Sequence, residues 1–187
     1  MRVLGISGSL RRDSLNRRLL RAAAALLPPG VELVELDPAA IKSLPIYDQD
    51  DDTTLVPLEV GVLRQAIEEA DGILFATPEY NGSIPGGLKN AIDWASRPVK
   101  AAALRNKPVA VVGASPGMFG AVWAQGDLRK ALGVAGARVV DRELPVAQAD
   151  EAFAFDDKLV DEDLELELRG IITDLVEAIH ARERAVA

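Results

Sequence analysis

The most informative part of the chain is residues 78–94, Pro-Glu-Tyr-Asn-Gly-Ser-Ile-Pro-Gly-Gly-Leu-Lys-Asn-Ala-Ile-Asp-Trp. They follow an apolar run, residues 72–77, that is typical of a buried strand, and they lead into an amphipathic helical pattern. A loop this rich in Gly, Pro, Asn and Ser exposes backbone donors and acceptors, as a planar polar ligand requires. Because ligands of open α/β sheets bind outside the carboxyl ends of the strands, we expect a ligand to lie against this loop.

A second loop of the same kind, residues 5–16, joins another predicted strand to another predicted helix. A phosphate dianion favours N–H and O–H donors, a helix N-terminus and a cation with forked donors. Here Ser9, Ser14 and Asn16 offer side-chain donors, and Arg11 offers the fork. The alternative is that Ser14 only caps the helix and that Arg11 is solvated. The two loops together predict a nucleotide-like ligand, with its phosphate at the first and its ring at the second.

Strand and helix patterns alternate along the whole chain. Strands are predicted at residues 2–7, 31–36, 72–77, 108–114 and 137–140, and helices at 14–27, 57–69, 87–96, 122–136 and 161–184. Several of the strands are near-continuous Val/Ile/Leu/Ala runs, as expected for parallel strands covered on both faces. We therefore predict an α/β fold, a flavodoxin-like three-layer sandwich with a five-stranded parallel sheet of order 2-1-3-4-5. We expect one domain over residues 1–187.

Composition narrows the chemistry. The chain has no cysteine, which excludes disulfides, thiolate metal sites and thiol redox chemistry, so a bound cofactor must carry any electrons. The net charge of −8 argues against a nucleic-acid partner. No apolar run approaches the ~18 residues needed to span a bilayer, so we expect a cytoplasmic protein with no membrane partner.

The charges are unevenly distributed. Residues 1–30 hold six Arg and one acidic residue, and this excess favours an anion site, although ordinary helix surface is the alternative. Residues 150–187 hold twelve acidic and four basic residues, which we interpret as a solvated helix face.

The sequence lacks the motifs of several enzyme classes. Neither the P-loop nor the dinucleotide fingerprint is present, and no G-x-S-x-G sequence or metal-ligand cluster is visible. The single histidine, His180, lies in the predicted terminal helix, far along the chain from both loops. We therefore predict no catalytic acid or base and no metal ligand.

Two motifs carry a family resemblance. Ser9-Leu10-Arg11-x-x-Ser14-x-Asn16, taken with Pro78-Glu79-Tyr80-Asn81-x-Ser83-x-Pro85-Gly86-x-Leu88-Lys89-Asn90-x-x-Asp93-Trp94, resembles the NADPH-dependent FMN reductase family. This flavodoxin-like family includes bacterial quinone, chromate and azo-dye reductases. The resemblance covers roughly residues 2–145, and the second motif is long enough to be specific.

The resemblance implies a set of FMN contacts. It puts the phosphate on Ser9, Arg11, Ser14 and Asn16, with Leu15 also at the cofactor, and borders the isoalloxazine with Pro78, Glu79, Tyr80, Asn81, Gly82 and Ser83. Residues 115–121 match the family's Gly-rich loop at the other edge of the flavin, with contacts from Ser115 and Gly117. The sequence departs from the family at Ala121, where a second Gly is common.

The implied activity is hydride transfer from NADPH or NADH to FMN N5, then electron transfer to a small acceptor at the same flavin face. Quinones, azo dyes, nitro compounds and chromate are the expected acceptors, and the order of events is ping-pong. Two alternatives stay open, an electron carrier like flavodoxin and a redox-sensing flavoprotein, each acting on a protein partner. Aromatic residues make up only 4% of the chain, which leaves few side chains to enclose a flavin as a carrier does.

We also expect a homodimer or a dimer of dimers. The helix predicted at 87–96 carries Leu88, Ile92 and Trp94 directly after the second loop, and Ile46 and Tyr47 add apolar bulk. An aromatic anchor beside a site is a common interface device. The alternative is that these side chains complete the core of a single subunit.

Overall fold

The computed structural model describes residues 1–53 and 55–186 and is built on one parallel sheet. Its strands are β1 (Arg2–Ser7), β2 (Glu32–Glu35), β3 (Gly72–Thr77), β4 (Pro108–Ala114), β5 (Arg138–Val139) and β6 (Pro145–Val146). The order is β2-β1-β3-β4-β5, with β6 also paired to β4, and every pair is parallel. The predicted order is confirmed, and the sixth short strand is an addition to it.

The helices alternate with the strands as the sequence predicts. They are α1 (Leu15–Ala25), α2 (Pro38–Lys42), α3 (Leu58–Glu69), α4 (Gly86–Ala95), α5 (Val122–Val134) and α6 (Glu162–Val186), with 3-10 turns η1 (Gln49–Asp51) and η2 (Val99–Ala101). The short α2 was not predicted; it begins at an Asp37 cap followed by Pro38. Within the described residues, no helix is long and apolar enough to cross a membrane.

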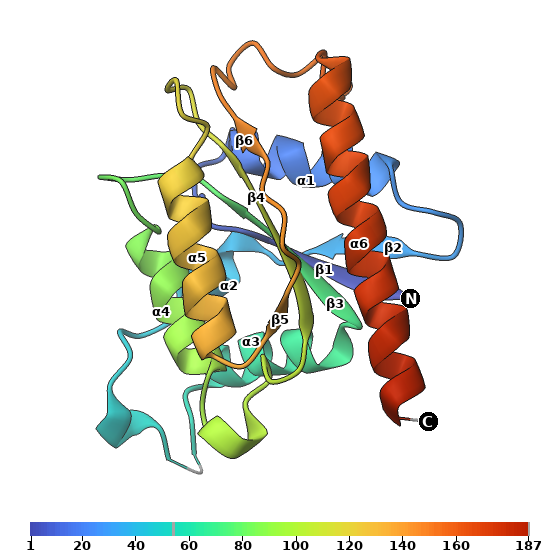
Figure 1. Ribbon diagram of the computed structural model, residues 1–187. Helices are drawn as coiled ribbons and strands as arrows, with labels where there is room; N and C mark the ends of the chain where they lie inside the picture. The colour runs from blue at the N-terminus through green and yellow to red at the C-terminus, as the bar shows by residue number, and fades with distance from the viewer. Residues whose placement is uncertain (54, 187) are drawn as a thin grey trace.

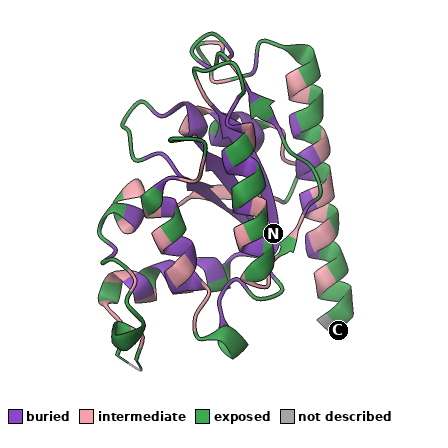
Figure 2. Ribbon diagram, turned by 60° about the vertical axis from the view of Figure 1, so that its left-hand side comes forward, coloured by how far each residue is buried: buried purple, intermediate pink, exposed green. Residues whose placement is uncertain are grey.

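The helices form two layers, one on each face of the sheet (Figure 1). α1 and α6 pack on one face, and α3, α4 and α5 pack on the other. Alternate residues of β3 serve the two cores, since Leu74 lies in the first and Phe75 in the second. Figure 2 shows the strands buried between helices whose outer faces are exposed.

The apolar residues of α4 face the interior of the subunit. Leu88, Ile92 and Trp94 are all buried, and Trp94 has no exposed surface. The Trp94 indole N–H donates to the Pro45 carbonyl oxygen at 2.9 Å, and its ring meets Tyr47 edge-on at 4.9 Å between centroids. The interpretation of these side chains as an interface anchor is therefore wrong. They complete the core, and Pro45 and Tyr47 of the connection from β2 to α3 contact Trp94.

The edge of the sheet next to β4 is interrupted by a bulge. Val139 of β5 pairs with Val109, and Pro145 of β6 pairs with Gly113. The edge chain thus uses two more residues than β4 over the same length, and the extra residues lie between β5 and β6. The charged run Asp141-Arg142-Glu143 falls in this bulge, where its side chains reach solvent.

A buried amide holds the bulge against the loop that precedes α5. Gln125, which has no exposed surface, accepts from the Leu144 N–H at 3.0 Å through Oε1 and donates from Nε2 to the Gly120 carbonyl at 3.2 Å. Gly120 has a φ of 56°, and a Cβ there would lie 2.4 Å from the carbonyl carbon of Pro145. The loop can pack this closely on β6 only because residue 120 is glycine.

We predict that Gln125→Leu destabilises the protein while keeping side-chain volume. The substitution leaves the Leu144 N–H and the Gly120 carbonyl buried without partners, which costs about 2–4 kcal/mol. The free energy of unfolding in urea measures this loss. The matched control is Gln65→Leu on the exposed face of α3, expected within about 0.5 kcal/mol of wild type. Equal stability of the two variants would contradict the assigned role of Gln125.

Candidate functional site

Three loops meet where β1, β3 and β4 end, because the carboxyl ends of parallel strands lie at one edge of the sheet. They enclose a cavity of about 170 Å³. It is lined by Ser9, Arg11, Leu15, Asn16, Pro78, Glu79, Tyr80, Ala114, Ser115 and Pro116. All of these except Ala114 and Pro116 are residues that the sequence predicted for the site.

The first loop combines donors with an unpaired cation. Ser14 caps α1, since its hydroxyl oxygen accepts from the Arg17 N–H at 3.2 Å. The Ser14 hydroxyl hydrogen remains available to donate. Arg11 is exposed at the cavity and has no carboxylate within 4.0 Å among residues 1–53 and 55–186. The first loop thus supplies hydroxyls, a helix N-terminus and a forked cation, the groups that an anion site uses.

Most of the other arginines in residues 1–30 form ion pairs with carboxylates outside the cavity. Arg17 pairs with Glu35 at 2.9 Å, and Arg18 pairs with Asp157 at 2.6 Å. The positive excess of residues 1–30 is therefore mostly ion-paired helix surface. Among the arginines of residues 1–30, Arg11 alone lines the cavity. The predicted anion site therefore depends on Arg11 and not on the whole group.

Asn16 joins the first loop to the third. Its side chain is 2% exposed, donates to the Ala114 carbonyl at 2.9 Å and accepts from the Ala114 N–H at 3.0 Å. The amide thus pairs with the end of β4 as a neighbouring strand would. One Nδ2 hydrogen is left for a ligand, because the amide has two.

The second loop is a tight hairpin. The backbones of Tyr80 and Ser83 exchange two hydrogen bonds, of 3.1 and 3.2 Å. Between them Asn81 has a φ of 53° and Gly82 a φ of 73°, the pattern of a type I′ turn. The hairpin sets Tyr80 at the cavity and puts Asn81 and Gly82 at an exposed tip.

Glu79 ties this hairpin to the start of α5. One carboxylate oxygen accepts from the N–H groups of Trp123 and Ala124, both at 3.1 Å. The helix has no cap of its own, since Ala121 precedes it with a φ of 63° and no side-chain hydrogen bond. A carboxylate from 44 residues earlier thus caps α5 and favours its positive end. The sequence indicates this contact only indirectly: position 121 has no Ser, Thr, Asp or Asn to cap α5, so the cap must come from another part of the chain.

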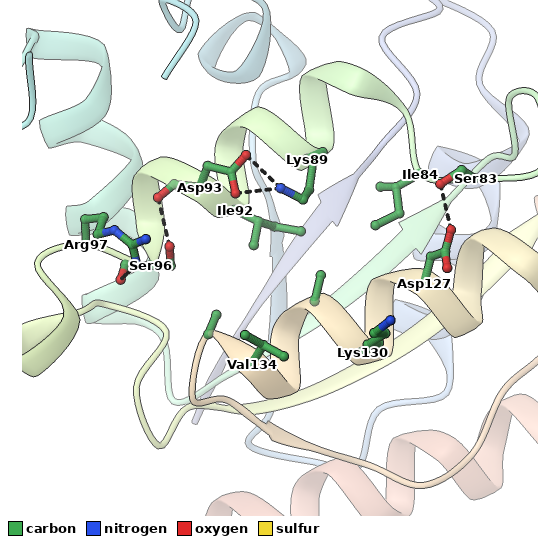
Figure 3. Close-up of a pocket in the computed structure, with 12 residues that line it drawn as sticks. Ser83, Ile84, Lys89, Ile92, Asp93, Ser96, Arg97, Asp127, Lys130 and Val134 are labelled. Atoms are coloured by element: carbon green, nitrogen blue, oxygen red, sulfur yellow. Dashed lines mark hydrogen bonds and ion pairs between the residues drawn. The ribbon is translucent and has the colours of Figure 1, made fainter. Parts of the chain in front are cut away.

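A second contact lies one turn further along α5. The Ser83 hydroxyl donates to the Asp127 carboxylate at 2.6 Å (Figure 3). This bond turns Ser83 away from the first cavity and toward a cleft of about 410 Å³ between α4 and α5. Lys89 and Asp93 pair across one turn of α4 in the same cleft, at 2.7 Å. The hairpin therefore lies between the first cavity, which Tyr80 lines, and the cleft between α4 and α5, which Ser83 lines.

The third loop contributes Ser115 to the cavity and is followed by an exposed aromatic pair. Ser115 lines the cavity, and its hydroxyl accepts from the Gly117 N–H at 3.2 Å. Phe119 and Trp123 pack with their ring centroids 4.8 Å apart, and both stay about half exposed. Met118 beside them is also exposed. Trp123 was not singled out from the sequence, where it reads as an ordinary helical residue.

The remaining predicted residues do not line the cavity. These are Ser14, Asn81, Gly82, Ser83 and Gly117. Their contacts with a ligand stay predictions. Within the described residues there is no group of three His, Cys, Asp or Glu side chains that could hold a metal ion.

Comparison with known proteins places this geometry in a family. Residues 1–151 match the model of the family described as NADPH-dependent FMN reductase. The chain belongs to the NADPH-dependent FMN reductase family. It is 44% identical over 163 residues to the NAD(P)H-dependent FMN reductase of Pseudomonas aeruginosa, covering 87% of this chain and 86% of that protein. It is also 44% identical over 129 residues to a 2-hydroxy-1,4-benzoquinone reductase of Burkholderia sp, covering 69% and 68%.

A solved flavoenzyme shares the architecture. The NAD(P)H:(acceptor) oxidoreductase FerB from Paracoccus denitrificans superposes with a TM-score of 0.82 at 38% identity, covering 96% of this chain and 97% of that one. The predictions of an FMN reductase family, of an oxidoreductase and of a flavodoxin-like fold are confirmed.

Proposed function

We propose that this FMN reductase family member is a cytoplasmic NAD(P)H oxidoreductase that passes electrons through bound FMN to small acceptors. One observation carries the proposal: three loops meet around a cavity whose lining includes Tyr80 and Arg11, and Arg11 has no carboxylate partner among the described residues. Bound FMN supplies the hydride and electron chemistry. We propose the thirteen predicted residues as its contacts, within one domain spanning the chain.

The first loop is suited to hold the FMN phosphate. Arg11 offers two parallel N–H donors, and Ser9 and Ser14 offer hydroxyls close to the α1 N-terminus. Charge-assisted bonds of this kind are about twice as strong as neutral ones. Since Arg11 has no carboxylate partner among the described residues, a phosphate there breaks no existing ion pair.

The second loop is suited to position the ring and leave one face open. Pro78 and Pro85 restrict φ at both ends of the hairpin, and Glu79 and Ser83 tie it to α5. Tyr80 is the single aromatic residue in the loop. We therefore infer that nicotinamide and acceptor occupy the same open face in turn, which is a ping-pong order.

We propose quinones as the first class of acceptor. The surface formed by Met118, Phe119 and Trp123 after the third loop is exposed and apolar, and it suits a flat aromatic molecule. The Burkholderia relative carries the name of a benzoquinone reductase. Azo dyes and nitroaromatics present the same flat shape; chromate, which is small and anionic, completes the proposed set.

We also propose a homodimer or a dimer of dimers, on different side chains from those first expected. The cleft between α4 and α5 is bordered by Val134, which is strongly exposed (Figure 3). Leu58 and Val62 are exposed one turn apart on α3, and Ile46 is exposed in the preceding connection. A second copy would bury these apolar side chains.

Anaerobic titration of the FMN-loaded protein tests the function. We expect NADPH or NADH to bleach the flavin in one two-electron step, and a small quinone to restore the oxidised spectrum through repeated turnovers. Initial rates at several quinone concentrations should give parallel double-reciprocal lines. A one-electron-reduced species that accumulates, with no reaction toward either nicotinamide, would identify an electron carrier instead.

Arg11→Glu tests the phosphate end of the site. The variant replaces the forked donor with a like charge, so we expect the Kd for FMN to rise by about 100-fold or more. Fluorescence titration of the apoprotein measures it. Arg12→Glu is the control, because its side chain does not line the cavity, and it should stay within about threefold of wild type. Wild-type affinity in Arg11→Glu would refute the phosphate assignment.

Sedimentation velocity at micromolar concentration tests the assembly. We expect a mass of two or four times 19.9 kDa. Val134→Glu should shift the protein toward the monomer by burying a charge in the interface. Leu166→Glu, at another exposed aliphatic position, on α6, should not. A wild-type species of single-chain mass would rule out the dimer.

A further inference from the structure

A separate cavity of about 450 Å³ lies at the opposite edge of the sheet, where β4 begins. Its lining includes Lys107, directly before β4, with Lys100, Arg105 and Arg182 around it. In Figure 1, η2 and the C-terminal end of α6 lie at the lower side of the molecule, whereas the loop after β4 lies at the top. A seven-residue strand separates the two cavities by roughly 20 Å.

The cavity gathers cations that have no ion-pair partner. None of Lys100, Arg105, Lys107 and Arg182 has a carboxylate within 4.0 Å in the described part of the chain. Glu68 is the acidic residue in the lining. This concentration of positive charge contrasts with the net charge of −8 of the whole chain. Like charges held together without counterions attract an anion.

Lys107 is the buried member of the group. It is 2% exposed, and its ammonium donates to the Ala70 carbonyl at 2.5 Å and to the Glu68 carbonyl at 3.2 Å. These bonds use two of its three N–H donors. Burial, together with the charge of Arg182, lowers the pKa of Lys107 to about 8, against the opposing effects of Asp71 and Glu68. A negative charge in the cavity would therefore compensate a buried cation.

The backbone adds one further donor. Ala103 is buried and lines the cavity, and its N–H group donates to no acceptor in residues 1–53 or 55–186. Buried backbone N–H groups without a partner are rare in proteins. A tetrahedral oxyanion has enough acceptor oxygens to satisfy this amide and the cations together.

We propose that this cavity binds a phosphate-class oxyanion, at a site distinct from the one that holds the flavin phosphate. Arg182 and Arg105 contribute charge from α6 and from the turn before β4, and Lys107 contributes it from the floor of the cavity. The volume exceeds the needs of a bare phosphate, so a phosphate ester or a diphosphate is the favoured form. The proposal does not depend on the acceptor or on the mechanism of the flavin site.

Calorimetric titration of the FMN-saturated enzyme tests the site, because FMN then fills the first phosphate loop. The probes are inorganic phosphate, pyrophosphate and glycerol 3-phosphate, at an ionic strength held constant with chloride. We expect saturable binding that weakens by at least about tenfold in the double variant Arg105→Gln/Arg182→Gln. Both side chains reach solvent, so the fold should survive. The control is Arg184→Gln, two residues further along α6 and on the opposite side of the helix, expected to bind as wild type.

The three probes separate the possible sources of the anion. Tighter binding of pyrophosphate or glycerol 3-phosphate than of phosphate would indicate a phosphorylated metabolite, and equal binding would indicate the inorganic ion. Absence of saturable binding by all three, or unchanged affinity in the double variant, would overturn the proposal. Neither result would bear on turnover with NAD(P)H and quinone, which is measured independently.

Discussion

The pairing of the Asn16 amide with both backbone groups of Ala114 is the contact on which the geometry of the site depends. It joins the start of α1 to the end of β4, residues 98 positions apart, in a place where water cannot compete. Glu79 then joins the hairpin to α5, and Gln125 joins α5 to the edge of the sheet. Each loop is thus held by a polar side chain from another element. The cavity is shaped before a ligand arrives, which lowers the ordering cost of binding.

The acidic C-terminal region has a structural role that its composition did not reveal. Asp157 lies in the connection before α6 and pairs with Arg18 and Arg21 of α1. Burial opposes the ionised form, yet hydrogen bonds from Arg21 and Arg18 lower the pKa of Asp157. These ion pairs neutralise Arg18 and Arg21 next to the first loop, so Arg11 is the arginine there that stays available to an anion. The interpretation of this region as a solvated face therefore holds only for part of it.

The sequence predicts the elements that depend on continuous apolar runs. β1, β3 and β4 have the predicted bounds, because strands buried on both faces cannot tolerate polar interruptions. β6 has two residues and begins with a proline, so no periodicity marks it. Trp94 was misassigned because a helical pattern shows an apolar face but not what covers it. The Glu79 contact depends on tertiary structure, and its only trace in the sequence is the uncapped start of α5.

Two kinds of residue follow the ends of the strands, those that hold the loops together and those that stay exposed. Glu79, Asn16 and Gln125 make the bonds between loops. The side chains of Met118, Phe119 and Trp123 make none of those bonds, and they stay exposed. Replacing one of these exposed side chains therefore changes the surface without breaking the bonds between the loops. If the proposed function holds, acceptor preference should vary with these exposed side chains, and flavin binding should depend on the polar contacts between the loops.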